Sequence, residues 1–364
     1  IRVMNRKKKI AVLFGGCSSE YEISLQSASA VLANIDREKY EAVPIGIAPD
    51  GKWYFYEGEL EKIAENTWLK EKKCYPAVVS PDRSLHGLLV FGRRGQGITE
   101  LPLDAAFPVL HGKNGEDGTV QGVFELADIP VVGCKTLASA IGMDKDVAHR
   151  LAAAAGVNVP RSVLLYRDSF VASDGEEAAG ALGYPLFVKP LRAGSSFGIT
   201  RVMGPGQLAD AIRLAFTHDS MVLLEEAISG FEVGCAVLGN HELFIGEVDE
   251  IELSEGFFDF TEKYTLKTSQ IHVPARIAEE TAERIKRTAA KIYRALGCSG
   301  FTRVDMFLTP KGEIYFNEVN TIPGFTEHSR YPGMMKAAGL SFAEVVEKLI
   351  AMTLKEAEEA HVEN

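Results

Sequence analysis

The sequence predicts an α/β fold divided into more than one domain. The chain has 364 residues, and domains commonly hold about 100–200 residues each. Residues 8–16, KKIAVLFGG, form a short apolar run that ends in two glycines, and a helix-like pattern follows at 22–35. A strand, a tight turn and a helix in this order open an α/β domain. Nearer the other end, residues 302–320 have the pattern of two strands joined by a turn.

Further strands are expected in the first third of the chain. Apolar runs at 42–48 and 105–110 predict them, and the short run 129–133 closes this region. Residues 53–68 are polar and aromatic and predict loops. Ser19 and Glu22 have the spacing of a capping box, which would fix the start of the first helix.

The rest of the chain alternates strands with helices. Asp144 is expected to cap an alanine-rich helix that Gly156 and Pro160 end. A long helix is expected at 278–297, and after a last helix the charged tail 356–364 should be frayed. Strands are expected at 185–190, 221–228, 232–239 and 244–253.

Composition narrows the classes of partner. The formal net charge of -11 leaves no basic face that could neutralise the phosphates of a nucleic acid, whereas ATP needs only a few local cations. Five cysteines without CxxC spacing are typical of free thiols in a reducing compartment. No apolar run reaches membrane-spanning length, and the basic first residues lack the apolar core of a signal peptide. We therefore expect a cytoplasmic protein without a membrane or nucleic-acid partner, with Met4 as the natural start.

The predicted hairpin is the most informative stretch for chemistry. Its turn, Thr-Pro-Lys-Gly, would place Leu308 opposite Glu313, and counting back places Arg303 opposite Glu318. Side chains two positions apart share a face of a strand. One face should therefore carry Arg303, Asp305, Glu318 and Asn320. The Asp, Glu and Asn side chains among them supply the oxygen ligands that suit Mg²⁺. The alternative is a solvated polar face with one Arg–Glu pair. A slip of one residue in the register would break the arrangement.

Two lysines and a glycine-rich loop indicate a phosphate site. The chain lacks GxxxxGK followed by Ser or Thr, so it is not a P-loop protein, and it lacks GxGxxG after its first strand. Lys189 ends a predicted strand, and the loop 191–200 after it offers backbone amides that can cover phosphates. Lys145 opposes the dipole of its helix, which a bound anion would relieve. Taken singly, a lysine is more often a solvated side chain, and this remains the alternative for each of them.

Seven motifs together resemble the ATP-grasp D-alanine–D-alanine ligases, and more closely the D-alanine–D-X ligases of vancomycin resistance, especially the D-alanine–D-serine type. They are GGCSSEYEIS (15–24), PVLHGKNGEDGTVQG (108–122), MDKDVAH (143–149), KPLRAGSSFGI (189–199), EKY (262–264), RVDMF (303–307) and NEVNTIPGFTEHSRYP (317–332). The resemblance implies an ATP-grasp fold. A Rossmann-like α/β domain at 8–134 would precede two α+β subdomains, 135–226 and 227–358, that enclose ATP.

The resemblance also implies a reaction. The carboxylate of D-alanine would attack the γ-phosphoryl group of ATP, and the amine of a second amino acid would then attack the acyl phosphate. Mg²⁺, lysines and backbone dipoles would offset the repulsion between the two anions. Glu20 would pair with the first ammonium group, while Arg303 and the Gly324 amide would stabilise the oxyanion.

The same resemblance assigns residues to each part of the site. The catalytic residues would be Glu20, Ser195, Tyr264, Arg303 and Gly324. ATP would contact Lys145, Lys189, Ser196, Glu225, Ile228, Glu232 and Lys263. The substrates would contact Glu20, His111, Ser329 and Arg330. Two Mg²⁺ ions, or Mn²⁺, would bind Asp305, Glu318 and Asn320. Each residue also has a structural reading, such as a first-turn carboxylate for Glu20 or a packed loop aromatic for Tyr264.

The acceptor is the least determined property. Ordinary D-alanine–D-alanine ligases usually carry an aliphatic residue after the serine of their HS motif, where this chain has Arg330. A cation would suit the hydroxyl of D-serine, and the retained Tyr264 suits an amine, so D-serine is favoured over D-alanine, and both over D-lactate. The loop at about 255–269 should be mobile and order over bound nucleotide. Family likeness implies a homodimer.

Functions of other classes remain as alternatives. One is another ATP-grasp carboxylate–amine ligase, such as a glutathione-synthetase-like protein. Another is a binding module without chemistry, which would be expected to lack Arg303, Asp305 or Glu318. A Rossmann dehydrogenase is disfavoured because GxGxxG is missing after the first strand.

Overall fold

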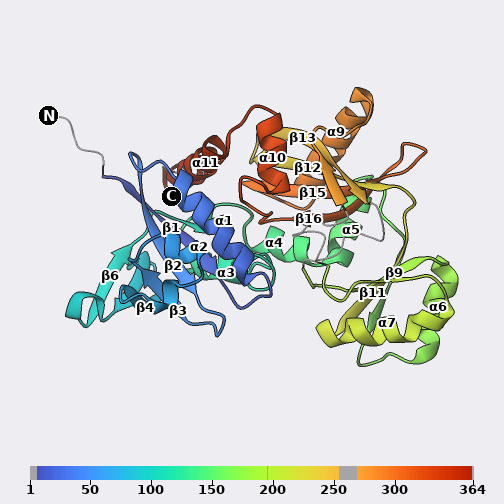
Figure 1. Cartoon of the computed structure of the whole chain (residues 1–364), viewed down its shortest axis with the longest axis horizontal. Coiled ribbons are helices and arrows are strands. Elements are labelled where there is room, and N and C mark those ends of the chain that lie inside the picture. Colours follow the sequence, from blue (N-terminus) through green and yellow to red (C-terminus); the bar gives the residue numbers. More distant parts are fainter. Residues whose placement is uncertain (1–5, 195, 254–268, 363–364) are drawn as a thin grey trace.

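The computed structural model describes residues 6–194, 196–253 and 269–362 and consists of three β-sheets with helices packed on them (Figure 1). The predicted α/β class is confirmed. Ser195, Lys263, Tyr264 and most of the loop at 255–269 lie outside the described residues. Within those described ranges, no helix combines the length and apolar character needed to cross a membrane.

The N-terminal sheet has the strand order β6-β5-β4-β3-β2-β1-β7. At its parallel centre, β1 (Lys8–Gly15) lies between β2 (Tyr40–Ile47) and β7 (Ala105–Pro108). Residues 10–14 of β1 are fully buried, as expected for a parallel strand covered on both faces. The antiparallel extension is formed by β3 (Trp53–Tyr56), β4 (Cys74–Val79), β5 (Gly87–Phe91) and β6 (Ile98–Pro102). The helices of this part are α1 (Tyr21–Asn34), α2 (Glu61–Ala64), α3 (Thr119–Leu126) and α4 (Thr136–Met143).

Two local predictions in this part were wrong. The capping box of Ser19 and Glu22 does not form, because Glu20 occupies the N-cap of α1 and makes no side-chain cap bond. The stretch 53–68 is largely regular structure, since its aromatic residues are core residues. Fully buried Trp68 packs edge-on against Phe14, with ring centroids 4.9 Å apart, and thereby anchors the segment.

The central sheet is antiparallel, with the order β10-β9-β11-β8. Its strands are β8 (Ser162–Tyr166), β9 (Leu186–Pro190), β10 (Thr200–Val202) and β11 (Met221–Glu226), and α6 (Ala172–Leu182) and α7 (Pro205–His218) pack on it. Before it, α5 (Lys145–Ala154) begins as predicted, because Val147 N donates to Asp144 Oδ1 at 3.1 Å. This sheet has a hydrophobic core of its own.

The C-terminal sheet is antiparallel, with the order β14-β13-β12-β15-β16. Its strands are β12 (Phe231–Gly239), β13 (Leu243–Leu253), β14 (Ser269–His272), β15 (Phe301–Leu308) and β16 (Ile314–Asn320), and its helices are α9 (Glu279–Ala295), α10 (Arg330–Ala337) and α11 (Phe342–Val362). The expected fraying from residue 356 was wrong as far as Val362, which still belongs to α11.

The first and third sheets share one hydrophobic core. The ring of Phe301 lies 6.2 Å from that of Phe107 and 5.2 Å from that of Phe325. Beside them, a Cβ on Gly300 would lie 2.5 Å from the Cα of Gly133, so two bare backbones meet. The N- and C-terminal parts therefore pack as one body, with the central sheet beside it (Figure 1).

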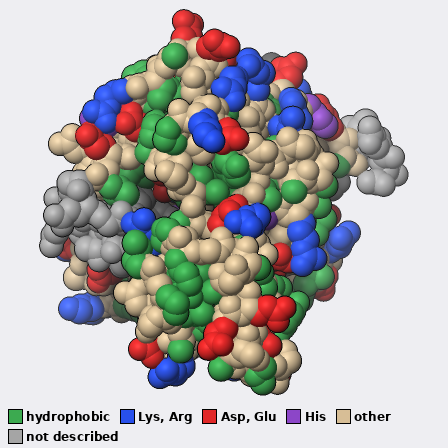
Figure 2. Space-filling model, turned by 90° about the vertical axis from the view of Figure 1, so that its right-hand side faces the viewer, with side chains coloured by type: hydrophobic (Ala, Val, Ile, Leu, Met, Phe, Trp, Pro, Cys, Tyr) green, Lys and Arg blue, Asp and Glu red, His purple; other side chains and the backbone are tan. Residues whose placement is uncertain are grey.

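On the face shown in Figure 2, basic and acidic side chains are mixed.

Candidate active site between the sheets

Two cavities adjoin between the three sheets. The larger has a volume of about 470 Å³ and is lined by β9, β11, β12 and β13. The smaller, about 40 Å³, lies where the loop after β7 approaches the end of β16. Lys145 and Glu318 line both cavities. A ligand that fills the larger cavity would therefore reach the mouth of the smaller one.

The larger cavity gathers most of the residues predicted to contact ATP: Lys145, Lys189, Ser196, Glu225, Ile228 and Glu232. The buried Lys189 Nζ pairs with Glu225 Oε1 at 2.6 Å. Glu225 Oε2 is buried and has no hydrogen-bond partner among the described atoms. Lys145 Nζ donates to the carbonyl of Ala193 at 3.1 Å, which ties the first turn of α5 to the glycine-rich loop. The cavity lining thus includes two lysines, and a buried acceptor, Glu225 Oε2, lies next to Lys189.

The hairpin lies between the cavities in a register that differs from the predicted one. Leu308 pairs with Ile314, so the loop is one residue longer than predicted, and a β-bulge at Asn317 shifts the pairing by one more. Asp305 therefore faces Glu318, and Arg303 faces Asn320. The predicted Arg303–Glu318 pairing was wrong. The two shifts together amount to two residues, the period of a strand, so the four polar residues still share one face.

His149 of α5 supports the bulge. Its Nε2 lies 2.7 Å from the carbonyl oxygen of Asn317. That oxygen can only accept, so Nε2 carries a proton and donates. Burial lowers the pKa of His149, partly offset by Glu225. A neutral imidazole thus fixes the backbone just before Glu318.

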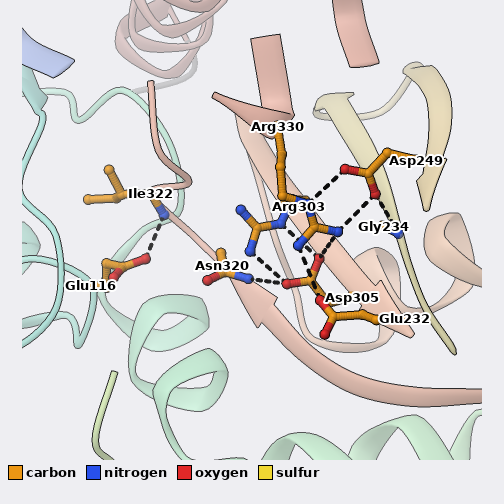
Figure 3. A network of polar contacts seen from close by, with 9 residues as sticks. All are labelled: Glu116, Glu232, Gly234, Asp249, Arg303, Asp305, Asn320, Ile322 and Arg330. Carbon is orange, nitrogen blue, oxygen red and sulfur yellow. Dashed lines mark hydrogen bonds and ion pairs between the residues drawn. The ribbon is translucent and has the colours of Figure 1, made fainter. Parts of the chain in front are cut away.

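Asp305 lies at the centre of a buried polar network (Figure 3). Arg303 donates to both carboxylate oxygens of Asp305, at 2.8 and 2.7 Å, and Asn320 Nδ2 donates to Oδ2 at 2.8 Å. In the described part of the chain, no group of three or more His, Cys, Asp or Glu side chains could hold a metal ion. The donor set of Asp305, Glu318 and the Asn320 amide oxygen would suit Mg²⁺ if phosphate oxygens completed it.

Arg330 lies behind this network and lines neither cavity. Its Nε and Nη2 donate to Asp249 at 2.7 and 2.8 Å, and its Nη1 donates to Glu232 at 3.1 Å. Nη2 is also 3.5 Å from Asp305 Oδ1. Burial alone would lower the pKa of Arg330, but Asp249 and Asp305 hold it well above its usual value. Burial and the nearby Asp305 raise the pKa of Glu232 to about 7.

The smaller cavity gathers most of the residues predicted to contact the substrates and the oxyanion. It is lined by Glu20, His111, Arg303 and Gly324, and also by Glu116. A Cβ on Gly112 would lie 2.6 Å from Glu20 Oε2, so the loop passes close to the carboxylate, and the positive φ of Gly112 favours glycine there. Ser329 does not line the cavity; its Oγ accepts from Thr326 N at 3.1 Å and contacts Thr326 Oγ1 at 2.8 Å.

Comparison with known proteins gives this arrangement a family. The model for the D-ala D-ala ligase N-terminus matches residues 9–134, and that for the C-terminus matches 151–351. The chain belongs to the D-alanine–D-alanine ligase family. Members of this family are ATP-grasp enzymes, so the expected ATP-grasp fold is confirmed and the chain is a ligase of the D-alanine–D-X type.

Individual family members are similar over nearly their whole length. The crystal structure of VanG D-Ala:D-Ser ligase from Enterococcus faecalis is 59% identical, with a TM-score of 0.89 and coverage of 96% of this chain and 100% of that one. The vancomycin/teicoplanin A-type resistance protein VanA of Enterococcus faecium is 47% identical, covering 97% of this chain and 100% of its own. A D-alanine–D-alanine ligase of Caldicellulosiruptor bescii is 42% identical, with 96% of each chain covered.

Two residues at the site of this family member had not been predicted individually. Glu116 and His149 both lie within motifs that indicated the family, PVLHGKNGEDGTVQG and MDKDVAH. The sequence thus contains a signal for their region. What each side chain contacts depends on segments far away in the chain, which no local pattern reports.

Proposed function

We propose that this ligase joins D-alanine to D-serine at the expense of ATP. The observation that carries the proposal is the pair of adjoining cavities that share Lys145 and Glu318. One offers the room and the cations that a nucleotide needs. The other offers a carboxylate, Glu20, for an ammonium group, and beside it the donors Arg303 and the Gly324 amide for a developing oxyanion.

In this proposal the larger cavity binds ATP. Glu225 Oε2, which accepts no hydrogen bond from a described residue, would accept one from the adenine amino group, beside Ile228. Glu232 would bind the ribose. Lys145, Lys189 and Ser196 would contact the phosphates. Lys263 would join them from outside the described residues.

Asp305, Glu318 and Asn320 would hold Mg²⁺; Glu318 lines both cavities, Asn320 lines the smaller one, and Asp305 lies behind them. Their oxygen donors share one face of the hairpin, which supports binding of Mg²⁺ there. The family likeness implies two ions, with Mn²⁺ as an alternative. When bound, the metal would offset negative charge on the reacting phosphates.

The reaction would proceed in two steps. A carboxylate oxygen of D-alanine attacks the γ-phosphorus, and ADP leaves. The amine of the second amino acid then attacks the acyl carbon, phosphate leaves and the nitrogen loses a proton. Glu20 would hold the first ammonium group with Ser195 and Tyr264, which lie outside the described residues. Arg303 and the Gly324 amide would stabilise the tetrahedral oxyanion.

D-serine is proposed as the acceptor on the basis of sequence identity and not of Arg330. The contacts of Arg330 with Asp249 and Glu232 weaken the idea that it touches the acceptor. Support comes instead from the 59% identity to a protein named as a D-Ala:D-Ser ligase, against 42% to one named as a D-alanine–D-alanine ligase. D-alanine and then D-lactate remain the alternatives. Ser329 would bind the acceptor carboxylate after a local rearrangement, and the protein would act as a homodimer.

Product identification tests the proposal. The enzyme would be incubated with ATP, Mg²⁺ and D-alanine in the presence of equal D-serine and D-lactate, and the products separated by mass spectrometry. We expect D-alanyl-D-serine as the main product. Predominant D-alanyl-D-alanine or D-alanyl-D-lactate would reject D-serine, and absence of any D-alanyl product would reject the whole proposal.

A further inference from the structure

The segment 322–325, which carries Gly324, is tied to the N-terminal part at three backbone atoms. Ile322 N donates to Glu116 Oε1 at 3.2 Å, and Ile322 O accepts from His111 Nδ1 at 2.9 Å. Phe325 N donates to Ser27 Oγ at 3.3 Å. Both sides of the Pro323–Gly324 peptide are therefore anchored, so the direction of the Gly324 N–H is set from outside its own segment.

Glu116 connects this segment to the loop beside Glu20. Its Oε2 accepts from Gly112 N at 2.8 Å while its Oε1 accepts from Ile322 N. Gly112 has a positive φ of 73° and lies directly against the Glu20 carboxylate. One carboxylate thus links the backbone behind the predicted ammonium site to the backbone that carries the predicted oxyanion donor. Figure 3 shows the second of these contacts, from Ile322 to Glu116.

His111 and Ser27 form the second connection. The carbonyl of Ile322 can only accept, so the proton of His111 is on Nδ1, and Nε2 accepts from the Ser27 hydroxyl at 3.0 Å. Ser27 Oγ in turn accepts from Phe325 N. His111 and Ser27 are buried and Glu116 is half-buried. The chain of bonds joins α1, the loop after β7 and the segment after β16.

We infer that Glu116, supported by His111 and Ser27, is a positioning residue that clamps the 322–325 segment so that the Gly324 N–H points at the oxyanion. This inference rests on the proposed role of Gly324. A carboxylate fits the task because both its oxygens accept, whereas a Gln side chain can accept through one oxygen only and would present its NH₂ group to the other N–H. If either Gly112 N or Ile322 N lost its acceptor, the loop at Gly112 and the 322–325 segment would no longer be held together by this side chain.

The test compares Glu116→Gln with Ser27→Ala and a matched control, Asp117→Asn. Asp117 also accepts from two backbone N–H groups, Asn114 and Thr119, but both lie in its own loop. Steady-state kinetics would follow ATP, D-alanine and the acceptor, together with phosphate released per dipeptide. Hydrogen exchange of residues 320–325 would report the clamp without any turnover.

We expect Glu116→Gln to lower kcat for dipeptide by about 10- to 100-fold, with KM for ATP unchanged. Phosphate released per dipeptide should rise, because slower attack by the amine leaves more time for water to hydrolyse the acyl phosphate. Hydrogen exchange of residues 320–325 should accelerate. Ser27→Ala should change the same quantities less, and Asp117→Asn should change none. A merely structural lesion would lower dipeptide and phosphate in proportion.

Unchanged exchange and unchanged coupling in folded Glu116→Gln would overturn the clamp. If that variant does not fold, Ser27→Ala decides by the same two readings. Failure of the proposed function has a different signature, since the wild-type enzyme would then make no D-alanyl dipeptide while the exchange of residues 320–325 still responded to Glu116→Gln.

Discussion

At the scale of single residues, Arg330 illustrates how burial decides the role of a charge. From the sequence it is a cation one position after a serine expected near the acceptor. In the structure its guanidinium binds the fully buried Asp249 bidentately, and a Cβ on Gly234 would lie 2.4 Å from Nη2. A buried ion pair contributes little net stability, but removing one partner leaves the other charge buried without a counterion, which is strongly destabilising.

Replacing Arg330 with Leu should therefore damage the fold before it alters selectivity. Asp249 would stay buried without its counterion, which costs about 3–5 kcal/mol. We expect urea unfolding to show this loss, and turnover with D-serine and D-alanine to fall together. Lys336→Leu, an exposed cation on the same helix, is the control. A stable Arg330→Leu protein that lost only D-serine activity would return Arg330 to the acceptor site.

Glu318 is a residue-scale test of the metal proposal. Glu318→Gln removes one negative charge and nearly preserves shape, so we expect turnover to be almost abolished while the melting temperature stays close to that of the wild type. The comparison variant is Glu313→Gln, in the exposed loop of the same hairpin. Wild-type phosphate release by Glu318→Gln at ordinary Mg²⁺ would remove Glu318 from the metal site.

At the scale of elements, the hairpin 301–320 was predictable in outline and not in register. Alternation and turn residues indicated two strands and the polar face. The longer loop and the bulge at Asn317 depend on contacts outside the hairpin, namely the bridge of Tyr315 to Asn158 and the bond from His149 to Asn317. The pattern of residues within the hairpin cannot predict the bridge to Asn158 or the bond from His149, because both partners lie elsewhere in the chain. The same limit explains 53–68, where the core that accepts Trp68 comes from β1 and α1.

The bulge gives an element-scale prediction. His149→Phe keeps a ring against Phe316, whose centroid is 5.3 Å away, but removes the donor to the Asn317 carbonyl. We expect stability to fall by about 1–3 kcal/mol. Because the bulge sets the position of Glu318, the Mg²⁺ concentration for half-maximal turnover should also rise. A variant that loses stability without any change in Mg²⁺ dependence would show that the bulge does not need His149.

At the scale of the whole molecule, the sequence indicated successive parts but not how their cores combine. Each run of apolar residues predicts a buried face, but it does not predict which other element packs against that face. The structure joins the first and third sheets through one core, in which Phe107, Phe301 and Phe325 meet, and leaves the central sheet with its own. The site therefore lies between a two-sheet body and a separate module. The smaller cavity lies mainly on the body, and the larger one between the two.

Separate cores predict separate responses to core mutations. Leu224→Ala, at a fully buried position of the central sheet, should lower the free energy of unfolding by about 2–5 kcal/mol. Phe301→Ala, in the shared core, should lower it by about 3–5 kcal/mol. We expect hydrogen exchange in Leu224→Ala to accelerate in β8–β11 alone, since that core is not continuous with the other. Phe301→Ala should accelerate exchange in the first and third sheets together and spare the central one. Leu214→Ala, at a position 48% exposed on α7, is the control and should change little. If either core variant accelerated exchange evenly through all three sheets, the molecule would unfold as one unit, and the cavity that binds nucleotide would lie within a single cooperative body rather than between two.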